Sequence, residues 1–299
     1  MVNIPGRKKK HILITGSSGF LGRYLIKYSP STNHILAHFR TKEPYPYGRE
    51  VHFFRMDAAD DQWDSLQDLE VDAIIHTAAM ASIDECQVRP GLANMVNFEF
   101  TRSLCDFAAE RNIRFIFTSS DVVFDGIKGF YQEKDAPVPQ NVYAKTKIDA
   151  ESYVLNNHPD AVVIRPSLFY GHALNGRPSF TEIMLKNLYQ GKKVFLFTDQ
   201  YRTPLLINNL STAVWELVDH NFTGMLHIGG SEKISRMEMG ELLCDMFNLD
   251  RNLLVPVKSK DARLVAKRPL DCSLNTDLAR SILNTQFVDC RTGFNLAFH

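Results

Sequence analysis

The chain has 299 residues, of which 44% are hydrophobic, and its 34 basic and 34 acidic side chains give a formal net charge of zero. A chain of this length can bury a large core, and balanced charge provides no overall field that would favour nucleic acid or an anionic membrane as a partner. The basic run at 6–10 is interpreted as a solvated lead-in to the first strand, with a nucleic-acid patch as the weaker alternative. The apolar run that follows is too short to span a bilayer, and no signal-peptide core precedes it, so we expect a cytoplasmic protein without a membrane segment.

Short apolar runs alternate with helical patterns through the first half of the chain. This alternation predicts a doubly wound parallel β-sheet with helices on both faces, an α/β fold. The expected strands are 11–15, 34–39, 51–56, 73–76, 114–118 and 161–165. Between the fourth and fifth strands, apolar residues at three- and four-residue steps predict one long helix over 92–108, with Met95 and Cys105 packed in the core.

The pattern becomes less regular after Pro166. Helices are expected at 179–190, 210–220 and 236–247, and strands at 194–197, 225–228 and 253–257. No Gly/Ser/Pro-rich linker marks a boundary, so we predict a first domain over 1–166 and a smaller lobe over 167–299, with a segment at about 205–235 returning to the first domain.

Cysteine and histidine usage argues against disulfides and a structural metal site. The five cysteines are odd in number and show no Cys-x-x-Cys spacing, which favours reduced thiols (Cys86, Cys105, Cys244, Cys272 and Cys290). The histidines are equally dispersed, so no metal is expected, although a divalent ion held by carboxylates stays open.

The first expected strand runs directly into three glycines, Gly16, Gly19 and Gly22. Glycine permits a tight turn and a close approach of phosphate to the backbone, and the N–H groups of a following helix attract an anion. Gly16 would make the turn, Gly19 would allow the approach and Gly22 would let helix pack on strand. The spacing indicates a dinucleotide cradle, and a plain strand-to-helix turn is the alternative.

Tyr143 and Lys147 are four residues apart, which places both on one face of a helix. A nearby ammonium favours the phenolate, so we expect Lys147 to lower the pKa of Tyr143 and to make the phenol a proton donor for a carbonyl. A half-buried tyrosine beside surface lysines is the alternative interpretation. Lys145 does not share this face.

Hydroxyl groups follow the fifth expected strand, with Ser120 followed by Asp121 and Val122. The carboxyl ends of parallel strands face the ligand crevice, so a hydroxyl there can bind a substrate oxygen, although hydroxyls are also common turn formers.

The order of these three features resembles the extended short-chain dehydrogenase/reductase family over nearly the whole chain. Within it, three strings resemble the dTDP-4-dehydrorhamnose reductase branch: SSDVVFDG at 119–126, YQEKDAPVPQNVYAKTK at 131–147 and KRPLDCSLNT at 267–276. The resemblance implies an α/β fold with a Rossmann doubly wound parallel sheet and a smaller interleaved α/β substrate lobe. It also implies a catalytic set of Ser120, Tyr143 and Lys147. Tyr143 would protonate the keto oxygen, Ser120 would hydrogen-bond the same oxygen, and Lys147 would hold the nicotinamide ribose.

Cofactor choice is indicated at the end of the second strand, where no acid is available for the ribose hydroxyls of NAD and Arg40 could pair a ribose phosphate. We therefore expect NADP as the cofactor, with NAD as the alternative. Arg40 could also have no role in binding and merely extend its charged end into solvent from the end of the strand. The resemblance adds further cofactor contacts, including Asn97, which could instead bridge helix and strand. The full cofactor-binding set comprises Gly16, Ser18, Gly19, Phe20, Leu21, Gly22, Arg40, Asp57, Ala58, Ala78, Ala79, Asn97, Tyr143, Lys147 and Arg165.

The expected substrate contacts follow from the same resemblance, which places basic residues near a nucleotide diphosphate. They are Asp121, Val123, Phe124, Arg202 and Arg268. Guanidinium groups suit phosphate geometry, and surface salt bridges would explain the two arginines equally well.

These expectations describe an NAD(P)H-dependent reductase of a keto group on a nucleotide-linked deoxysugar. A dehydratase of the family carries an Asp-Glu pair after the catalytic hydroxyl, and Val122 stands in place of that glutamate. Two alternatives stay open: a nucleotide-sugar epimerase and a non-catalytic NADP-binding subunit resembling the methionine adenosyltransferase beta subunit. The expected partners are a nucleotide sugar and a second copy in a homodimer, while the sequence leaves open the sugar and the nucleotide.

Overall fold

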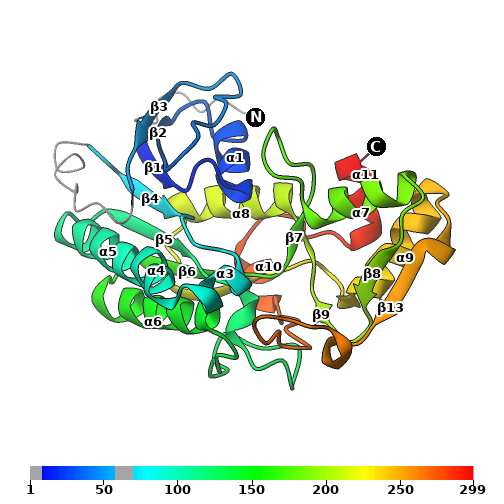
Figure 1. The fold of residues 1–299 in the computed structure, drawn as a ribbon. Coiled ribbons are helices and arrows are strands. Elements are labelled where there is room, and N and C mark those ends of the chain that lie inside the picture. Colours follow the sequence, from blue (N-terminus) through cyan, green and yellow to red (C-terminus); the bar gives the residue numbers. More distant parts are fainter. Residues whose placement is uncertain (1–8, 58–69, 299) are drawn as a thin grey trace.

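A seven-stranded parallel sheet forms the centre of the fold in the computed structural model, which describes residues 9–57 and 70–298 (Figure 1). The strand order is β11-β6-β5-β4-β1-β2-β3. The strands are β1 (His11–Thr15), β2 (His34–Phe39), β3 (Val51–Arg55), β4 (Ala73–His76), β5 (Arg114–Thr118), β6 (Ala161–Pro166) and β11 (Gly224–Ile228). All seven coincide with predicted strands to within one residue at each end, and the predicted α/β doubly wound class is confirmed.

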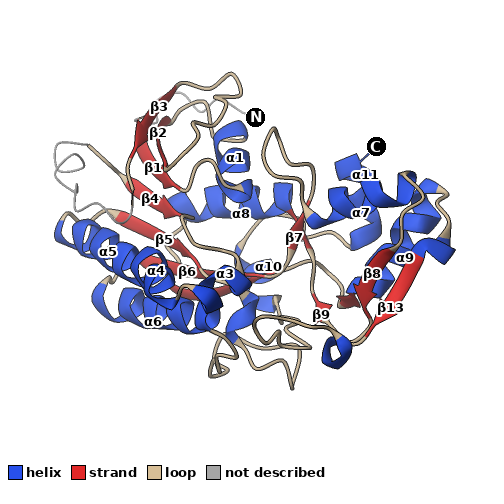
Figure 2. Cartoon of the chain, viewed as in Figure 1, coloured by secondary structure: helices blue, strands red, loops and turns tan. Residues whose placement is uncertain are grey.

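Alternating residues of each strand face different helices. Ile12 and Ile14 pack in one buried cluster with α1 (Phe20–Lys27) and α8 (Ile207–Asp219). Leu13 faces the opposite cluster, formed with α5 (Phe100–Glu110) and α6 (Val142–Asn157). Helices therefore cover both faces of the sheet, α1 and α8 on one side and α4, α5 and α6 on the other (Figure 2). This two-sided burial explains why the strands are continuous apolar runs.

The chain reverses its direction of winding at β1, which lies between β2 and β4 in the sheet. Strands β2 and β3 extend the sheet to one side, and β4, β5 and β6 extend it to the other. In open parallel sheets this switch point leaves a crevice beyond the carboxyl ends of the strands, where ligands bind.

The helix predicted over 92–108 is present, but it contains a wider turn. It consists of α4 (Pro90–Asn94), a π-helical turn at Met95–Glu99 and then α5. Cys105 is buried as predicted, whereas Met95 is 39% exposed, so the prediction that Met95 packs in the core is wrong. A π turn adds a residue to one turn of helix and rotates the side chains relative to a regular α-helix.

Residues after β6 build a second cluster of elements beside the sheet. Strands β8 (Val194–Phe197) and β13 (Leu254–Val257) pair in parallel. They pack with α7 (Phe180–Tyr189), α9 (Arg236–Phe247) and α11 (Cys290–Phe298) around a separate core. Shorter elements connect them: β7 (Phe169–Tyr170), β9 (Tyr201–Arg202), β10 (Leu205–Leu206), β12 (Ile234–Ser235), α10 (Asp277–Ile282), and 3-10 turns at Arg251–Leu253 and Ser259–Asp261. Two short elements precede β6: α3 (Ile83–Val88) follows β4, and a 3-10 turn at Asp121–Val123 follows β5.

Between these elements the chain returns to the sheet. Helix α8 packs in the cluster beneath α1, and β11 pairs with β6 as the outermost strand. The segment that precedes α9 thus belongs spatially to the sheet. Within the described residues, no helix is both long and apolar enough to cross a membrane.

Candidate functional site

The glycine turn after β1 is closed so tightly that side chains would not fit. Gly16 has a φ of +68°, and a Cβ there would lie 2.6 Å from the backbone nitrogen of Ala78. A Cβ on Gly22 would lie 2.4 Å from the carbonyl oxygen of Gly16. Helix α1 begins after Gly19 without a side-chain cap and without an acidic residue in its first turn. Its first N–H groups are therefore available to an anion.

Two adjoining cavities lie beyond the carboxyl ends of the central strands. One, of about 590 Å³, is lined by Gly16, Ser18, His38, Arg40 and Ala78, among others. The other, of about 460 Å³, is lined by residues of α1, the end of β5, α6 and the second cluster of elements. Both include Gly19, Thr77, Ala79 and Ala81, so the glycine turn joins them. We call the second one the β5 cavity.

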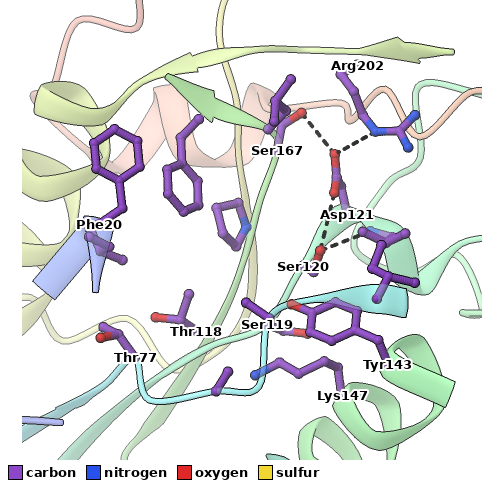
Figure 3. A pocket seen from close by; sticks show the side chains of 18 of the residues that line it. Phe20, Thr77, Thr118, Ser119, Ser120, Asp121, Tyr143, Lys147, Ser167 and Arg202 are labelled. Carbon is purple, nitrogen blue, oxygen red and sulfur yellow. Dashed lines mark hydrogen bonds and ion pairs between the residues drawn. The ribbon is translucent and has the colours of Figure 1, made fainter. Parts of the chain in front are cut away.

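Ser120, Tyr143 and Lys147 meet in the wall of the β5 cavity (Figure 3). Asn141 caps α6 by accepting the N–H of Ala144 at 2.8 Å, which places Tyr143 in the first turn and Lys147 one turn later. Tyr143 is 8% and Lys147 is 1% exposed. Burial raises the pKa of the Tyr143 phenol well above its usual value, against the opposing effect of its hydrogen bond with the Ser120 hydroxyl.

The pKa of Tyr143 is raised rather than lowered in this structure, so the predicted lowering is wrong. Burial outweighs every charge near the phenol. Burial likewise lowers the pKa of the Lys147 ammonium to about 7, although the Glu151 carboxylate acts in the opposite direction. The ammonium nitrogen lies 4.1 Å from the centroid of the Phe117 ring. A phenol that stays protonated and an amine that exchanges its proton near neutral pH therefore lie on one helix face.

Asp121 holds the Ser120 hydroxyl through a hydrogen bond (Figure 3). Its Oδ1 accepts a hydrogen bond from Ser120 Oγ at 3.3 Å, and its Oδ2 accepts one from Ser167 Oγ at 3.2 Å. The same Oδ2 lies 3.3 Å from Arg202 Nε. Burial raises the pKa of the Asp121 carboxyl, and the Arg202 charge opposes this rise.

Most predicted site residues line the two cavities. The cofactor set contributes Gly16, Ser18, Gly19, Phe20, Leu21, Gly22, Arg40, Ala78, Ala79, Tyr143 and Lys147, and the substrate set contributes Asp121, Arg202 and Arg268. Asp57 is not among the described residues lining either cavity. Ala58 lies outside the described residues.

Three other predicted residues, Val123, Phe124 and Arg165, are buried and border neither cavity. Val123 and Phe124 pack in a small core with Cys272 and Leu274. Arg165 donates two hydrogen bonds to the Glu151 carboxylate, at 2.9 and 2.6 Å, and both side chains are 3% exposed. These three residues support the site without bordering its open space.

Asn97 occupies the π turn and holds the cavity wall together. Its side-chain oxygen accepts the N–H of Met80 at 2.8 Å, and its amide donates to Thr146 Oγ1 of α6 at 3.1 Å. It is completely buried. Asn97 thus has a structural role of the kind expected as the alternative to cofactor binding, although it joins α6 and the loop after β4 rather than a helix and a strand.

The cavities also have lining residues that were not predicted from the sequence, among them Arg177, Gln200 and Arg236. Arg177 and Gln200 lie in loops with no recognisable motif, and Arg236 begins a helix after the capping residue Ser235. The capping pattern signals a helix start, but no local signal indicates that the following side chain faces a cavity.

The residues present fit a dinucleotide. The turn is a cradle that any Cβ would fill, the start of α1 is free of acids, and Ala78, Ala79 and Ala81 form a small-residue wall opposite. Within the described residues, no group of three or more His, Cys, Asp or Glu side chains could hold a metal ion. All five cysteines are buried free thiols.

The sheet topology, the glycine turn and the cavities define a Rossmann-type α/β protein with a nucleotide-binding crevice. The family model described as RmlD substrate binding domain matches residues 10–298, and the chain belongs to this family. Its structural relatives place it among the extended short-chain dehydrogenases/reductases.

Several named proteins are similar to this chain. The probable low-salt glycan biosynthesis reductase Agl14 of Haloferax volcanii is 29% identical, over 87% of each chain. Methionine adenosyltransferase 2 subunit beta of Bos taurus is 31% identical, over 91% of this chain and 82% of the relative. A hypothetical dTDP-4-dehydrorhamnose reductase from Sulfolobus tokodaii has a TM-score of 0.82 at 31% identity, covering 95% of this chain and 98% of that one.

One further structure shares the fold at lower identity. The dTDP-4-dehydrorhamnose reductase of Bacillus anthracis in complex with NADP has a TM-score of 0.84 at 22% identity, covering 97% of this chain and 99% of that one. Two unlike functions are thus represented among similar proteins, a sugar-modifying reductase and a subunit of another enzyme.

Proposed function

We propose that this protein is an NADPH-dependent reductase of a keto group on a nucleotide-linked deoxysugar. The observation that carries the proposal is the meeting of Ser120, Tyr143 and Lys147 in one cavity that also borders the glycine turn. Similarity to Agl14 and to the Sulfolobus tokodaii protein supports the same activity.

The reaction requires a hydride at the keto carbon and a proton at the keto oxygen. NADPH supplies the hydride when it is bound. The Tyr143 phenol, whose raised pKa keeps it protonated at neutral pH, donates the proton to the oxygen, and the Ser120 hydroxyl hydrogen-bonds the same oxygen. Lys147, with a pKa of about 7, then returns a proton toward the phenolate. The product is the alcohol, and Asp121 keeps Ser120 oriented throughout.

The cofactor would lie across both cavities, with its diphosphate at the first turn of α1. Gly19 and Gly22 permit the close approach, and Lys147 would bind ribose hydroxyls. Arg40 lines the other cavity, which the glycine turn joins to the β5 cavity. A guanidinium there can pair with a ribose phosphate, which supports NADP as the donor, with NAD as the alternative.

Two alternatives would use the same site. A nucleotide-sugar epimerase would use the same three side chains without net consumption of the nicotinamide. A non-catalytic NADP-binding subunit is favoured by the similarity to methionine adenosyltransferase 2 subunit beta. Stable association with a methionine adenosyltransferase catalytic chain, together with no keto-sugar turnover, would favour this second alternative.

The placement and assembly of the protein are proposals as well. The free thiols support a reducing compartment, and we place the protein in the cytoplasm. We propose that residues 1–166 bind the cofactor and residues 167–299 mainly bind the substrate, with β11 and α8 as the returning segment, and that the chain forms a homodimer.

The test is incubation of the purified protein with NADPH and a panel of 4-keto-6-deoxy nucleotide sugars, following nicotinamide absorbance. A reductase consumes NADPH in proportion to one of the sugars. NADPH binding without consumption by any of them contradicts the proposal.

A further inference from the structure

Three arginines line the β5 cavity, and they differ in what their guanidinium groups already contact. They are Arg202, Arg236 and Arg268. Each N–H of a guanidinium is a donor that needs an acceptor when it is buried. An arginine whose N–H groups donate to protein acceptors stabilises the cavity wall. An arginine with a buried N–H group that has no protein acceptor can donate to a ligand.

Arg202 is used by the protein itself. Its Nη1 donates to the carbonyl oxygens of Tyr201 and Leu270, at 2.6 and 2.9 Å, and its Nη2 donates to that of Pro269 at 3.2 Å. Its Nε lies 3.3 Å from the Asp121 carboxylate. Arg202 thus joins β9 to the 269–271 segment and to the turn after β5.

Arg268 is also paired. Its Nη2 lies 2.9 Å from the Asp84 carboxylate, and its Nη1 donates to the carbonyl oxygen of Ala266 at 3.0 Å. The charge of this arginine is balanced by an acid that the protein supplies.

Arg236 differs from both. Its Nη1 is buried, and within the part of the chain that the structure describes it has no hydrogen-bond partner. The guanidinium carbon lies 4.4 Å from the centroid of the Phe180 ring, a stacking contact that holds the plane of the group. Burial and the nearby Arg202 charge lower the pKa of Arg236 to about 9, so the group is still a cation at neutral pH.

The charges around Arg236 leave an excess of one positive charge. Arg202 and Arg236 both interact with Asp121, the acid that acts on Arg236 in this wall, and Arg202 contacts it directly. Arg236 is half-buried, but a buried guanidinium nitrogen without an acceptor is costly unless an anion accepts from it. Arg236 and Ser120 line the same cavity.

We propose that Arg236 binds the diphosphate of the nucleotide-sugar substrate, and that Arg202 and Arg268 shape the cavity wall instead. This inference rests on the proposed function, because it assigns the substrate of that same cavity. A nucleoside diphosphate held there would lie close to Ser120, so that the attached sugar can reach the Tyr143 phenol.

The test is a calorimetric titration of the NADP⁺-saturated full-length protein with UDP, dTDP, GDP and CDP. Arg236→Met removes the charge and the donors while retaining a long apolar side chain. We expect its affinity for the diphosphate that binds the wild type to fall by about tenfold to a hundredfold, since a charge-assisted hydrogen bond is lost. The corresponding nucleoside, which has no phosphate, should bind the variant and the wild type equally.

Arg251→Met is the matched control, because Arg251 is an exposed arginine of the same part of the chain, paired with Asp245 at the surface. It should bind the diphosphate as the wild type does. If thermal unfolding shows that Arg236→Met is not folded, Arg236→Gln replaces it, with the same expected loss.

An unchanged diphosphate affinity of the Arg236 variant overturns the inference, as does a wild-type protein that binds none of the four diphosphates. An Arg236-dependent affinity together with no turnover of any keto sugar contradicts the proposed reductase and leaves the binding site supported.

Discussion

Tyr143 and Lys147 share one buried helix face, and burial shifts their pKa values in opposite directions. The phenol becomes a weaker acid and the ammonium a stronger one. Desolvation penalises the charged form of either group, so the neutral phenol and the neutral amine are both favoured. The pair suits proton donation to a carbonyl better than a permanent phenolate would.

The Lys147 shift predicts a pH-dependent stability. The pKa of Lys147 is about 7 in the folded protein, against 10.5 for an unperturbed lysine, so the unfolded chain binds more protons between these values. The unfolding free energy contributed by Lys147 therefore rises as the pH rises from about 7 to 10.5. Lys147→Met should lack this rise, which denaturant unfolding at several pH values measures.

Lys145→Met is the control for this experiment. Lys145 is exposed on the same helix and pairs with Asp149 at 2.8 Å. Its removal should leave the pH dependence of unfolding as in the wild type. A constant difference in unfolding free energy between wild type and Lys147→Met over this pH range would contradict the lowered pKa.

Among individual residues, the sequence could predict those whose role follows from local spacing. Tyr143 and Lys147 share a helix face in any structure in which that helix forms, and Ser120 follows a strand. Arg165 was predicted to contact the cofactor and Arg236 was not predicted, because the surroundings of both side chains depend on distant partners. A glutamate on α6 neutralises Arg165, while Nη1 of Arg236 has no acceptor among the described residues.

Among the elements, the turn between β1 and α1 sets the site most directly. Gly22→Ala would bring a Cβ to 2.4 Å from the Gly16 carbonyl oxygen, an atom of the backbone that has no room to move. We expect a loss of about 1–3 kcal/mol in unfolding free energy, as for other overpacked positions. The affinity for NADP⁺ should also fall, because the added Cβ pushes the glycine turn away from α1. Thermal unfolding and NADP⁺ titration measure the two effects.

Gly91→Ala in α4 provides the comparison. A Cβ at Gly91 meets no heavy atom of the described residues within 4 Å. Alanine is favoured over glycine in a helix by up to about 1 kcal/mol, so this variant should be as stable as the wild type or more so. If the two alanine variants had the same unfolding free energy and the same affinity for NADP⁺, the close contact at Gly22 would be unimportant.

Element prediction succeeded where burial imposes a simple pattern. The strands of the parallel sheet are covered on both faces, so they are continuous apolar runs that the sequence displays openly. The two-residue strands β7, β9, β10 and β12 were not predicted, since two residues show no periodicity. The π turn at Asn97 was missed as well, because the hydrogen bonds that Asn97 makes there, to Met80 and Thr146, join residues that local spacing does not relate.

In the whole molecule, the two cavities adjoin at the switch point of the sheet, and the second cluster of elements closes the β5 cavity from the other side. Gly19 and Phe20 of the sheet side and Gln200 and Arg236 of the second cluster line the same space. A hydride donor at the glycine turn and an acceptor near Arg236 would therefore meet at Ser120 and Tyr143. This arrangement predicts a reductase rather than a binding subunit.

The most direct test compares NADPH oxidation by wild type and by Tyr143→Phe. The substrate is the 4-keto-6-deoxy nucleotide sugar with which the wild-type protein consumes NADPH. Loss of the proton donor should lower kcat by about a hundredfold or more, the usual contribution of a general acid. NADPH affinity, measured by fluorescence titration, should stay the same, because the ring is retained. Equal turnover by the two proteins would contradict the account, and so would the absence of turnover by wild-type protein that binds NADPH.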